Sequence, residues 1–188
     1  MIIGLCGYAR SGKDTIAEFL VKEHGFTRLA FADPMKEALV RLNPKITVNG
    51  INGVYLSSVV SKLGWDNLKE SSPDVRELLQ RMGTEVGREM FGEYFWIDYL
   101  MNKALEIKSN IVISDVRYLN EINAIKTWNG QVWRINRPKV GPANDHSSEQ
   151  EVDLYKDYDV IVNNDSSVED LFSELTPLLE QIKVHNGN

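Results

Sequence analysis

The sequence predicts an α/β protein with three layers, in which helices cover both faces of a five-stranded parallel sheet. Five short apolar runs have the composition of strands, and several are continuous rather than alternating, which is typical of strands buried on both faces. Helical patterns separate these runs, giving the strand–helix–strand order of an α/β domain. The runs are residues 2–6, 28–31, 110–114, 131–135 and 159–162.

The first run is followed directly by a glycine-containing loop, Gly7-Tyr-Ala-Arg-Ser-Gly-Lys-Asp-Thr15, and then by a helical pattern over 13–24. Between a buried strand and a helix, the backbone N–H groups of such a loop and the helix dipole converge on a phosphate chain. Gly7 and Gly12 permit the tight turn, and Lys13 adds a positive charge. A chance glycine turn is the alternative, and the strand before the loop and the helix after it argue against that. The motif predicts nucleotide binding and leaves the phosphate acceptor open.

The residue after the lysine is Asp14, where Ser or Thr is usual in this motif. A carboxylate can hold a hard cation through oxygen, directly or through water. Thr15 can offer its hydroxyl to a phosphate. We therefore expect Mg²⁺ beside the loop, with Asp14 as one ligand.

The second helix is expected to begin near Pro34, and a further helix is expected at about 96–107. A helix opening at Pro73 carries one apolar stripe formed by Val75, Leu78, Leu79, Met82, Val86 and Met90. Residues 43–72 are ambiguous and read as an excursion or small lobe. The polar segment 137–153 lies between two core strands, where a long loop is usually functional or disordered.

A helix at the C-terminal end is expected from the residues that favour its first turn and from a proline within it. Ser166 and Glu169 form a capping box, and Pro177 should kink or split the helix.

Bulk properties bound the class of protein. The chain has 188 residues and a mass of 21.4 kDa, which suits a single domain over 1–188. A net charge of −6 argues against an extended surface for polymeric nucleic acid. No apolar run reaches membrane-spanning length, and Cys6 is the one cysteine, so we expect an intracellular protein without a membrane partner. Three scattered histidines make a protein-held zinc site unlikely to form.

The third run ends in Ser-Asp115-Val-Arg117. An Asp at the end of a strand beside a phosphate loop can orient Mg²⁺ or polarise the attacking oxygen, which would make Asp115 catalytic and a metal ligand. Arg117 should face the same crevice at the carboxyl ends of the strands. The alternative is an Asp that only caps the next helix.

Arginines are needed in phosphoryl transfer because donor, acceptor and transition state all carry negative charge. Each could equally be solvated surface. The candidates are Arg10, Arg76, Arg81, Arg88, Arg117, Arg134 and Arg137. The segment 137–153 could close over the donor and exclude water.

A second ligand would meet Asp33 and Lys36 at the end of the second strand. Tyr94 and Trp96 could stack on a base or belong to the core.

Together these segments resemble the bacteriophage deoxynucleoside monophosphate kinases, and the likeness runs from end to end. The matching motifs are 7–15, Phe-Ala-Asp-Pro-Met-Lys (31–36), Val-Arg-Glu-Leu-Leu-Gln-Arg-Met-Gly-Thr-Glu (75–85), Phe-Trp-Ile (95–97), Ile-Ser-Asp-Val-Arg (113–117), Arg-Pro (137–138) and Asp-His-Ser-Ser-Glu (145–149). Family members also carry Asp after the lysine. The resemblance implies a P-loop kinase fold with strand order 2-3-1-4-5, an acceptor-binding region at about 33–98 and a lid at about 137–153.

The resemblance also implies an activity, the transfer of the γ-phosphoryl group of ATP to a deoxynucleoside 5′-monophosphate with Mg²⁺. Donor phosphates would be held by Arg10, Gly12, Lys13, Asp14, Thr15 and Arg137. Lys13, Asp115 and Arg117 would act in catalysis. Carried over by position, Lys36, Arg76, Gln80 and Trp96 would hold the monophosphate and its base, while Arg117 and Arg137 would bind phosphates during closure. The charged side chains already named, Asp33, Arg81 and Arg88, complete the expected acceptor-binding set. The cytoplasm, that of a host if the protein is viral, is the implied location, and a homodimer is left open.

The sequence leaves two other hypotheses for the function open. Phosphomevalonate kinases of the animal type share a loop ending in Gly-Lys-Asp and a strand ending in Ser-Asp-x-Arg, so the acceptor could be a small phosphorylated metabolite. A nucleotide-dependent switch that hydrolyses ATP slowly is a reading from another class. The accepted bases and the selectivity for deoxyribose are not determined by the sequence.

Overall fold

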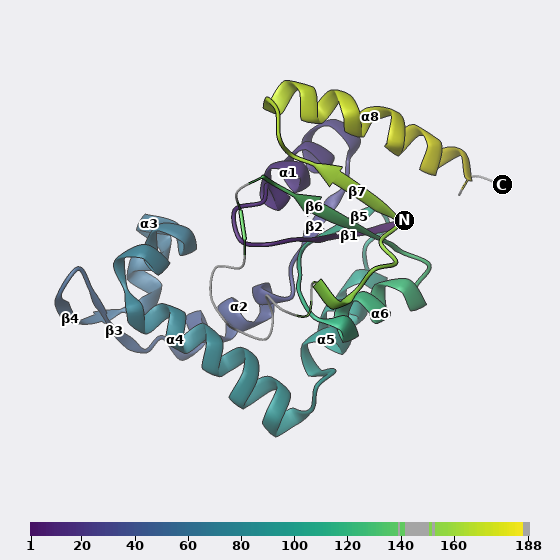
Figure 1. Ribbon diagram of the computed structural model, residues 1–188. Coiled ribbons are helices and arrows are strands. Elements are labelled where there is room, and N and C mark those ends of the chain that lie inside the picture. The colour runs from purple at the N-terminus through teal and green to yellow at the C-terminus, as the bar shows by residue number, and fades with distance from the viewer. Residues whose placement is uncertain (139, 142–150, 152, 186–188) are drawn as a thin grey trace. The chain divides into compact units, whose positions relative to one another are not determined.

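The computed structural model describes residues 1–138, 140–141, 151 and 153–185 (Figure 1). The chain forms two compact units, each described here by itself. The first, called the sheet unit, comprises Met1–Ala30 and Lys103–Asn188, and the second unit comprises Phe31–Asn102. No helix in the described ranges is both long enough and apolar enough to span a membrane.

The sheet unit is built on a parallel sheet with the strand order β2-β5-β1-β6-β7. Counted among these five strands alone, the order is 2-3-1-4-5, and the chain numbering differs because β3 and β4 lie in the second unit. The strands are β1 (Ile2–Cys6), β2 (Thr27–Leu29), β5 (Ile111–Val116), β6 (Gln131–Asn136) and β7 (Val160–Asn163). The predicted fold class is confirmed.

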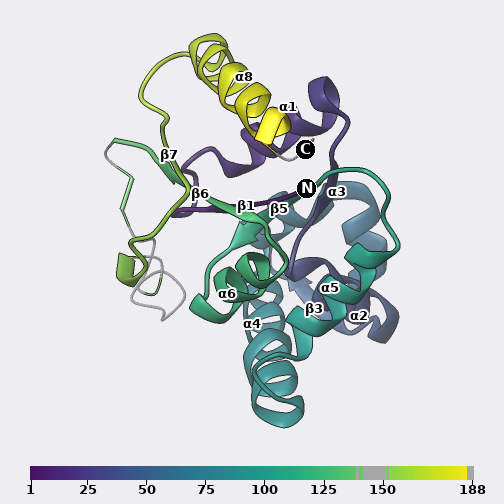
Figure 2. The same ribbon diagram turned by 90° about the vertical axis from the view of Figure 1, so that its right-hand side faces the viewer.

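Helices cover both faces of this sheet (Figures 1 and 2). On one face lie α1 (Lys13–His24) and α8 (Val168–His185), and on the other lies α6 (Leu119–Thr127). Ile3 and Leu5 of β1 point into the core beneath α1 and α8, where both are fully buried. Because side chains alternate along a strand, Gly4 faces α6, and a Cβ there would lie 2.6 Å from a methyl of Ile125. This packing fixes the carboxyl end of β1, from which the phosphate loop starts.

The second unit combines helices with a small antiparallel hairpin. Its elements are α2 (Ala32–Leu42), β3 (Lys45–Val48), β4 (Ile51–Tyr55), α3 (Leu56–Ser71), α4 (Pro73–Arg81), the π-helix η1 (Met82–Met90) and the start of α5 (Phe95–Leu105). Leu39, Leu56, Leu68 and Val75 are buried in a core of its own. The ambiguous stretch 43–72 is therefore the hairpin and α3.

The helix expected from Pro73 to Met90 is not uniform, because its second half is the π-helix η1. The i→i+5 bonding of a π-helix shifts the face of later residues, so the 3.6-residue stripe stops applying. Met90, assigned to the buried stripe, is 71% exposed. Trp96 accounts for the wider turn: its Nε1 donates to the Gly83 carbonyl at 3.1 Å, and a Cβ on Gly87 would lie 1.9 Å from that nitrogen.

Other predicted boundaries differ from the observed ones by one or two residues. β2 ends at Leu29 and α2 begins at Ala32, before Pro34, whereas β5 continues through Asp115 to Val116. The predicted Ser166 cap of α8 is wrong by one residue.

Ser167 forms that cap, because its Oγ accepts a hydrogen bond from the Asp170 N–H at 3.2 Å and donates to the Asp170 carboxylate at 2.8 Å. Pro177 does not split α8, which runs through it with Leu175 and Leu179 buried on either side.

Candidate active site

The phosphate loop of the sheet unit has the backbone that its glycines predict. Gly7 and Gly12 have φ angles of 153° and 107°, and Arg10 has a φ of 65°, in the left-handed region. Gly12 is the N-cap of α1, and no side chain caps the helix there. The first N–H groups of α1 are thus not taken by a cap of the chain's own, which is the arrangement that binds a phosphate.

Lys13 lies inside this turn. Its side chain is buried, and its Nζ donates to the carbonyl oxygens of Gly7 and Tyr8, both at 2.7 Å. The loop therefore places an ammonium group directly at the start of α1. A buried ammonium at a helix N-terminus favours a multiply charged anion beside it.

Two residues far along the chain secure the loop, and sequence reasoning missed one of them. The side-chain amide of Asn164 donates to the Ser11 carbonyl at 2.9 Å. A Cβ on Gly12 would lie 2.3 Å from this same amide nitrogen, so a larger residue there would displace the amide and its hydrogen bond to Ser11. Arg137, predicted to bind donor phosphates, donates to the Arg10 carbonyl at 3.4 Å. Asn164 could not have been found locally, because 153 residues separate it from Ser11.

Asp14 and Thr15 lie in the first turn of α1, and the Asp14 side chain is exposed there. Asp115 is half-buried near the end of β5, the strand that pairs with β1. Mg²⁺ in nucleotide sites is usually held by one or two carboxylates together with substrate phosphates and waters. In the described parts of the chain, no group of three His, Cys, Asp or Glu side chains could hold a metal unaided. The donor set therefore fits a cation brought in with a phosphate chain.

The turn after β5 is held by Glu121, which sequence reasoning also missed. Its carboxylate is buried and accepts the backbone N–H groups of Arg117 at 2.8 Å and Tyr118 at 3.1 Å. These two charge-assisted hydrogen bonds fix the backbone at Arg117. Because Glu121 belongs to α6, this helix sets the position of the Arg117 side chain.

In the second unit, several predicted acceptor residues lie on α2, α4 and η1, elements that pack together. Lys36 lies 3.6 Å from Asp33 on α2, and Arg76 Nε donates to the Lys69 carbonyl at 2.8 Å. Arg81 pairs with Glu85 at 3.1 Å.

The remaining acceptor candidates differ in exposure. Gln80 is exposed on α4, and Arg88 is half-buried on η1. Trp96 is buried, with its Nε1 engaged by Gly83.

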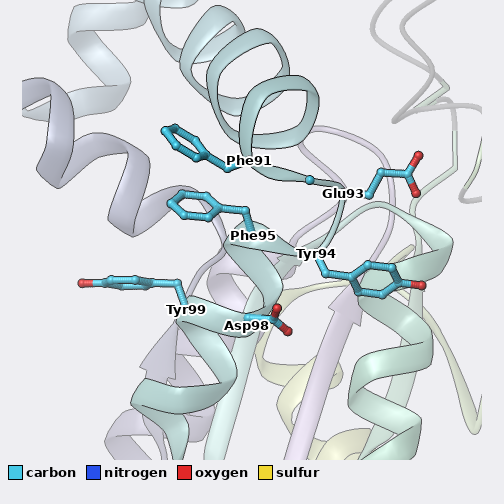
Figure 3. Close-up of a pocket in the computed structure, with 7 residues that line it drawn as sticks. Phe91, Glu93, Tyr94, Phe95, Asp98 and Tyr99 are labelled. Atoms are coloured by element: carbon cyan, nitrogen blue, oxygen red, sulfur yellow. The ribbon is translucent and has the colours of Figure 1, made fainter.

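A pocket of about 360 Å³ lies at the junction of η1 and α5 (Figure 3). Tyr94, the other aromatic expected to meet a base, lines it and is exposed. The Phe91 and Phe95 rings stack with their centroids 5.0 Å apart, and in Figure 3 they point to the same side as Tyr99, away from Tyr94. Sequence reasoning did not single out these three side chains, because their shared direction depends on where η1 ends and α5 begins.

The predicted lid at 137–153 falls largely outside the described residues, which omit 139, 142–150 and 152. Its final residue, Asp153, is described and contacts the phosphate loop, because its carboxylate accepts a hydrogen bond from the Tyr8 hydroxyl.

Comparison with known proteins agrees with this geometry. The model of the deoxynucleotide monophosphate kinase family matches residues 1–60 and 51–175, and the chain belongs to that family. A protein of Acanthamoeba polyphaga mimivirus assigned to these kinases is 30% identical over 99% of this chain and 100% of its own. The deoxynucleotide monophosphate kinase of Enterobacteria phage T4 is 23% identical, over 95% of this chain and 98% of its own.

Among solved structures, dephospho-CoA kinase from Campylobacter jejuni is similar in fold. It aligns with a TM-score of 0.56 and 17% identity, covering 98% of each chain. The protein thus has the fold of a P-loop kinase and is a phosphotransferase of the nucleotide kinase class.

Proposed function

We propose that the protein transfers the γ-phosphoryl group of ATP to a deoxynucleoside 5′-monophosphate, giving ADP and the diphosphate. The observation that carries this proposal is the loop at the start of α1, where a glycine N-cap is followed directly by the buried Lys13 ammonium. Membership of the deoxynucleotide monophosphate kinase family supplies the acceptor class.

The residues of the sheet unit have separate tasks in this reaction. Lys13 neutralises the β- and γ-phosphates, while Gly12 and Thr15 bring backbone and hydroxyl donors to them. Asp14 and Asp115 would hold Mg²⁺, and the ion would supply positive charge that offsets the negative charge of the phosphates. Arg117 and Arg137 gather phosphate oxygens from the two sides of the loop.

The second unit would carry the acceptor. Lys36, Arg76, Arg81 and Arg88 provide positive charge for the monophosphate, with Asp33 orienting Lys36 through their ion pair. Gln80 and Trp96 would meet the base. The acceptor phosphate is already an oxygen nucleophile at neutral pH, so catalysis comes from positioning and charge neutralisation.

We further propose that the two units work as one kinase domain over 1–188, with residues 137–153 closing over the donor to exclude water. The expected location is the cytoplasm, of a host if the protein is viral, and a homodimer is compatible with this function.

The test is ADP release coupled to an indicator reaction, measured with dAMP, dCMP, dGMP, dTMP and their ribonucleotide counterparts, with and without Mg²⁺. Turnover with one or more deoxynucleotides, lost on chelation of the cation, is the expected result. The same assay is run with phosphomevalonate as the acceptor and with no acceptor, to test the two alternative functions. Turnover with phosphomevalonate alone would assign a metabolite kinase, and slow ADP release that no acceptor stimulates would assign a nucleotide switch.

A further inference from the structure

A polar cluster next to the phosphate loop has no role in the phosphoryl transfer proposed above. It consists of Tyr8, Arg134, Asn136, Asp153 and Tyr158, all in the sheet unit. Arg134 is its centre: it lies on the inner strand β6, opposite Cys6 of β1, and its side chain is only 9% exposed. A guanidinium at such a position must be compensated by the groups around it.

The described contacts of this guanidinium include one within β6, to Asn136, and others to the phosphate loop and to residues 153 and 158. Its Nε donates to the Asn136 side chain at 3.1 Å, and one terminal nitrogen donates to the Asp153 carboxylate at 3.0 Å. Its central carbon lies 4.9 Å from the centre of the Tyr8 ring and 5.9 Å from that of Tyr158. The guanidinium group therefore lies over the ring of Tyr8 in the phosphate loop and near the ring of Tyr158, which precedes β7.

Asp153 completes the connection to the loop. The same carboxylate that pairs with Arg134 accepts a hydrogen bond from the Tyr8 hydroxyl. This hydrogen bond, with burial, raises the pKa of Tyr8, so the hydroxyl stays protonated and remains a donor at neutral pH. Tyr8 is thus held by its ring and by its hydroxyl at once.

The backbone of Tyr8 is in turn part of the seat of the Lys13 ammonium. Its carbonyl accepts from Lys13 Nζ at 2.7 Å and from the Ser11 N–H at 3.2 Å. A shift of Tyr8 would therefore move the carbonyl that orients the charge on the donor phosphates.

We propose that Arg134 is a positioning residue for phosphoryl transfer, which holds the Tyr8 ring and the Asp153 carboxylate together and so fixes the phosphate loop around Lys13. In this proposal Arg134 acts through Tyr8 and not on a phosphate directly, in contrast to the direct role considered for it together with Arg137 from the sequence. Asp153 carries the same constraint to the end of the segment 137–153. The inference rests on the proposed use of this loop for ATP.

The experiment compares Arg134→Lys with Lys126→Met in the full-length protein. Lysine keeps the charge and loses the planar fork and the stacking. Lys126 pairs with Asp159, the residue that follows Tyr158, at 2.6 Å. Lys126→Met therefore breaks an ion pair to the segment before β7 and leaves the contacts of the phosphate loop in place. Binding of a non-hydrolysable ATP analogue with Mg²⁺ is measured by calorimetry, beside KM and kcat for both substrates and the thermal midpoint.

Arg134→Lys should weaken the analogue about tenfold and raise KM for ATP in parallel, while KM for the monophosphate stays within about twofold. Lys126→Met should leave both affinities unchanged. Tyr8→Leu should reproduce the Arg134→Lys loss, and the double variant should be little worse than either single one, because both remove the same contact.

Wild-type affinity in a folded Arg134→Lys protein would overturn the proposal. So would losses in Lys126→Met of the same size as in Arg134→Lys, or strictly additive effects with Tyr8→Leu. If Arg134→Lys does not fold, Tyr8→Leu and Asp153→Asn decide the question by the same readouts. A wild-type protein that binds the analogue but phosphorylates no monophosphate would refute the proposed function alone, whereas one that binds no analogue would refute both.

Discussion

The two units hold their candidate residues in different ways. In the sheet unit, Lys13 is buried and held by backbone carbonyls, and Asn164 reaches the same loop from the end of β7. In the second unit, Arg76 and Arg81 are exposed on α4, each with a surface partner within seven residues. The candidate donor residues are thus held by core packing, while Arg76 and Arg81 are exposed charges with local partners. Changes in the first group should affect ATP binding and turnover, and changes in the second should affect acceptor binding alone.

The largest effect is expected at Lys13. Lys13→Ala removes the ammonium from the start of α1 and should lower kcat about a thousandfold, with little change in the circular dichroism spectrum. Lys22→Ala on the same helix is the control, since Lys22 is exposed and pairs with Glu18. Near-normal turnover of Lys13→Ala would show that the phosphate loop is not the binding site for ATP.

Gly12→Ala should impair both binding and stability. The new Cβ meets the Asn164 amide at 2.3 Å in a backbone with a φ of 107°. We expect KM for ATP to rise tenfold or more, roughly, and the free energy of unfolding to fall by about 1–3 kcal/mol. Gly25 also has a positive φ, of 68°, but has open space around it, so Gly25→Ala should lose only about 1 kcal/mol and no ATP affinity. Equal effects at the two glycines would show that Asn164 does not matter.

Arg76→Ala tests the second unit. Loss of one phosphate-binding charge should raise KM for the monophosphate about tenfold and leave KM for ATP unchanged. Arg41→Ala is the control, because Arg41 is an exposed arginine of α2 that pairs with Glu37. A rise in KM for ATP instead would break the division of labour between the units, and no change in either constant would exclude Arg76 from the acceptor site.

Gly87→Ala tests the π-helix. Its Cβ would lie 1.9 Å from the Trp96 ring nitrogen, so the free energy of unfolding should fall by about 1–3 kcal/mol in urea denaturation. Gly83→Ala should be milder, because its Cβ meets only the flexible Met35 thioether at 3.0 Å. If Gly83→Ala proves the more harmful of the two, Trp96 does not control the path of η1.

The smallest effect concerns Cys6. Burial raises the pKa of its thiol, so the thiolate is scarce at pH 8 and reaction with a disulfide reagent should be much slower in the native protein than in guanidinium. Because the folded pKa lies above the unfolded one, this thiol contributes stability below about pH 8.5 that is lost as pH rises through the folded pKa. Equal rates of modification before and after unfolding would contradict this burial.

Prediction from sequence was most successful where the signal is local. The bounds of β1 and α1 were predicted to the residue, because an apolar run, two glycines and a helical period define them without distant contacts. It failed after Met82, where a local period of 3.6 residues gave way to a π-helix held by Trp96, a residue 13 positions from Gly83. The bonding of one helix was decided by a side chain of the next.

By itself, the sequence determined the class of this protein: a parallel α/β sheet with a phosphate loop, containing Lys13 and Asp14, after its first strand. Glycine conformation, helix dipole and charge are properties of the segment 7–15 alone. Only the tertiary structure decided what holds that segment in place. Asn164, Glu121 and Arg134 support the site from positions that no spacing rule connects to it, because sheet pairing and side-chain packing join residues irrespective of their distance along the chain.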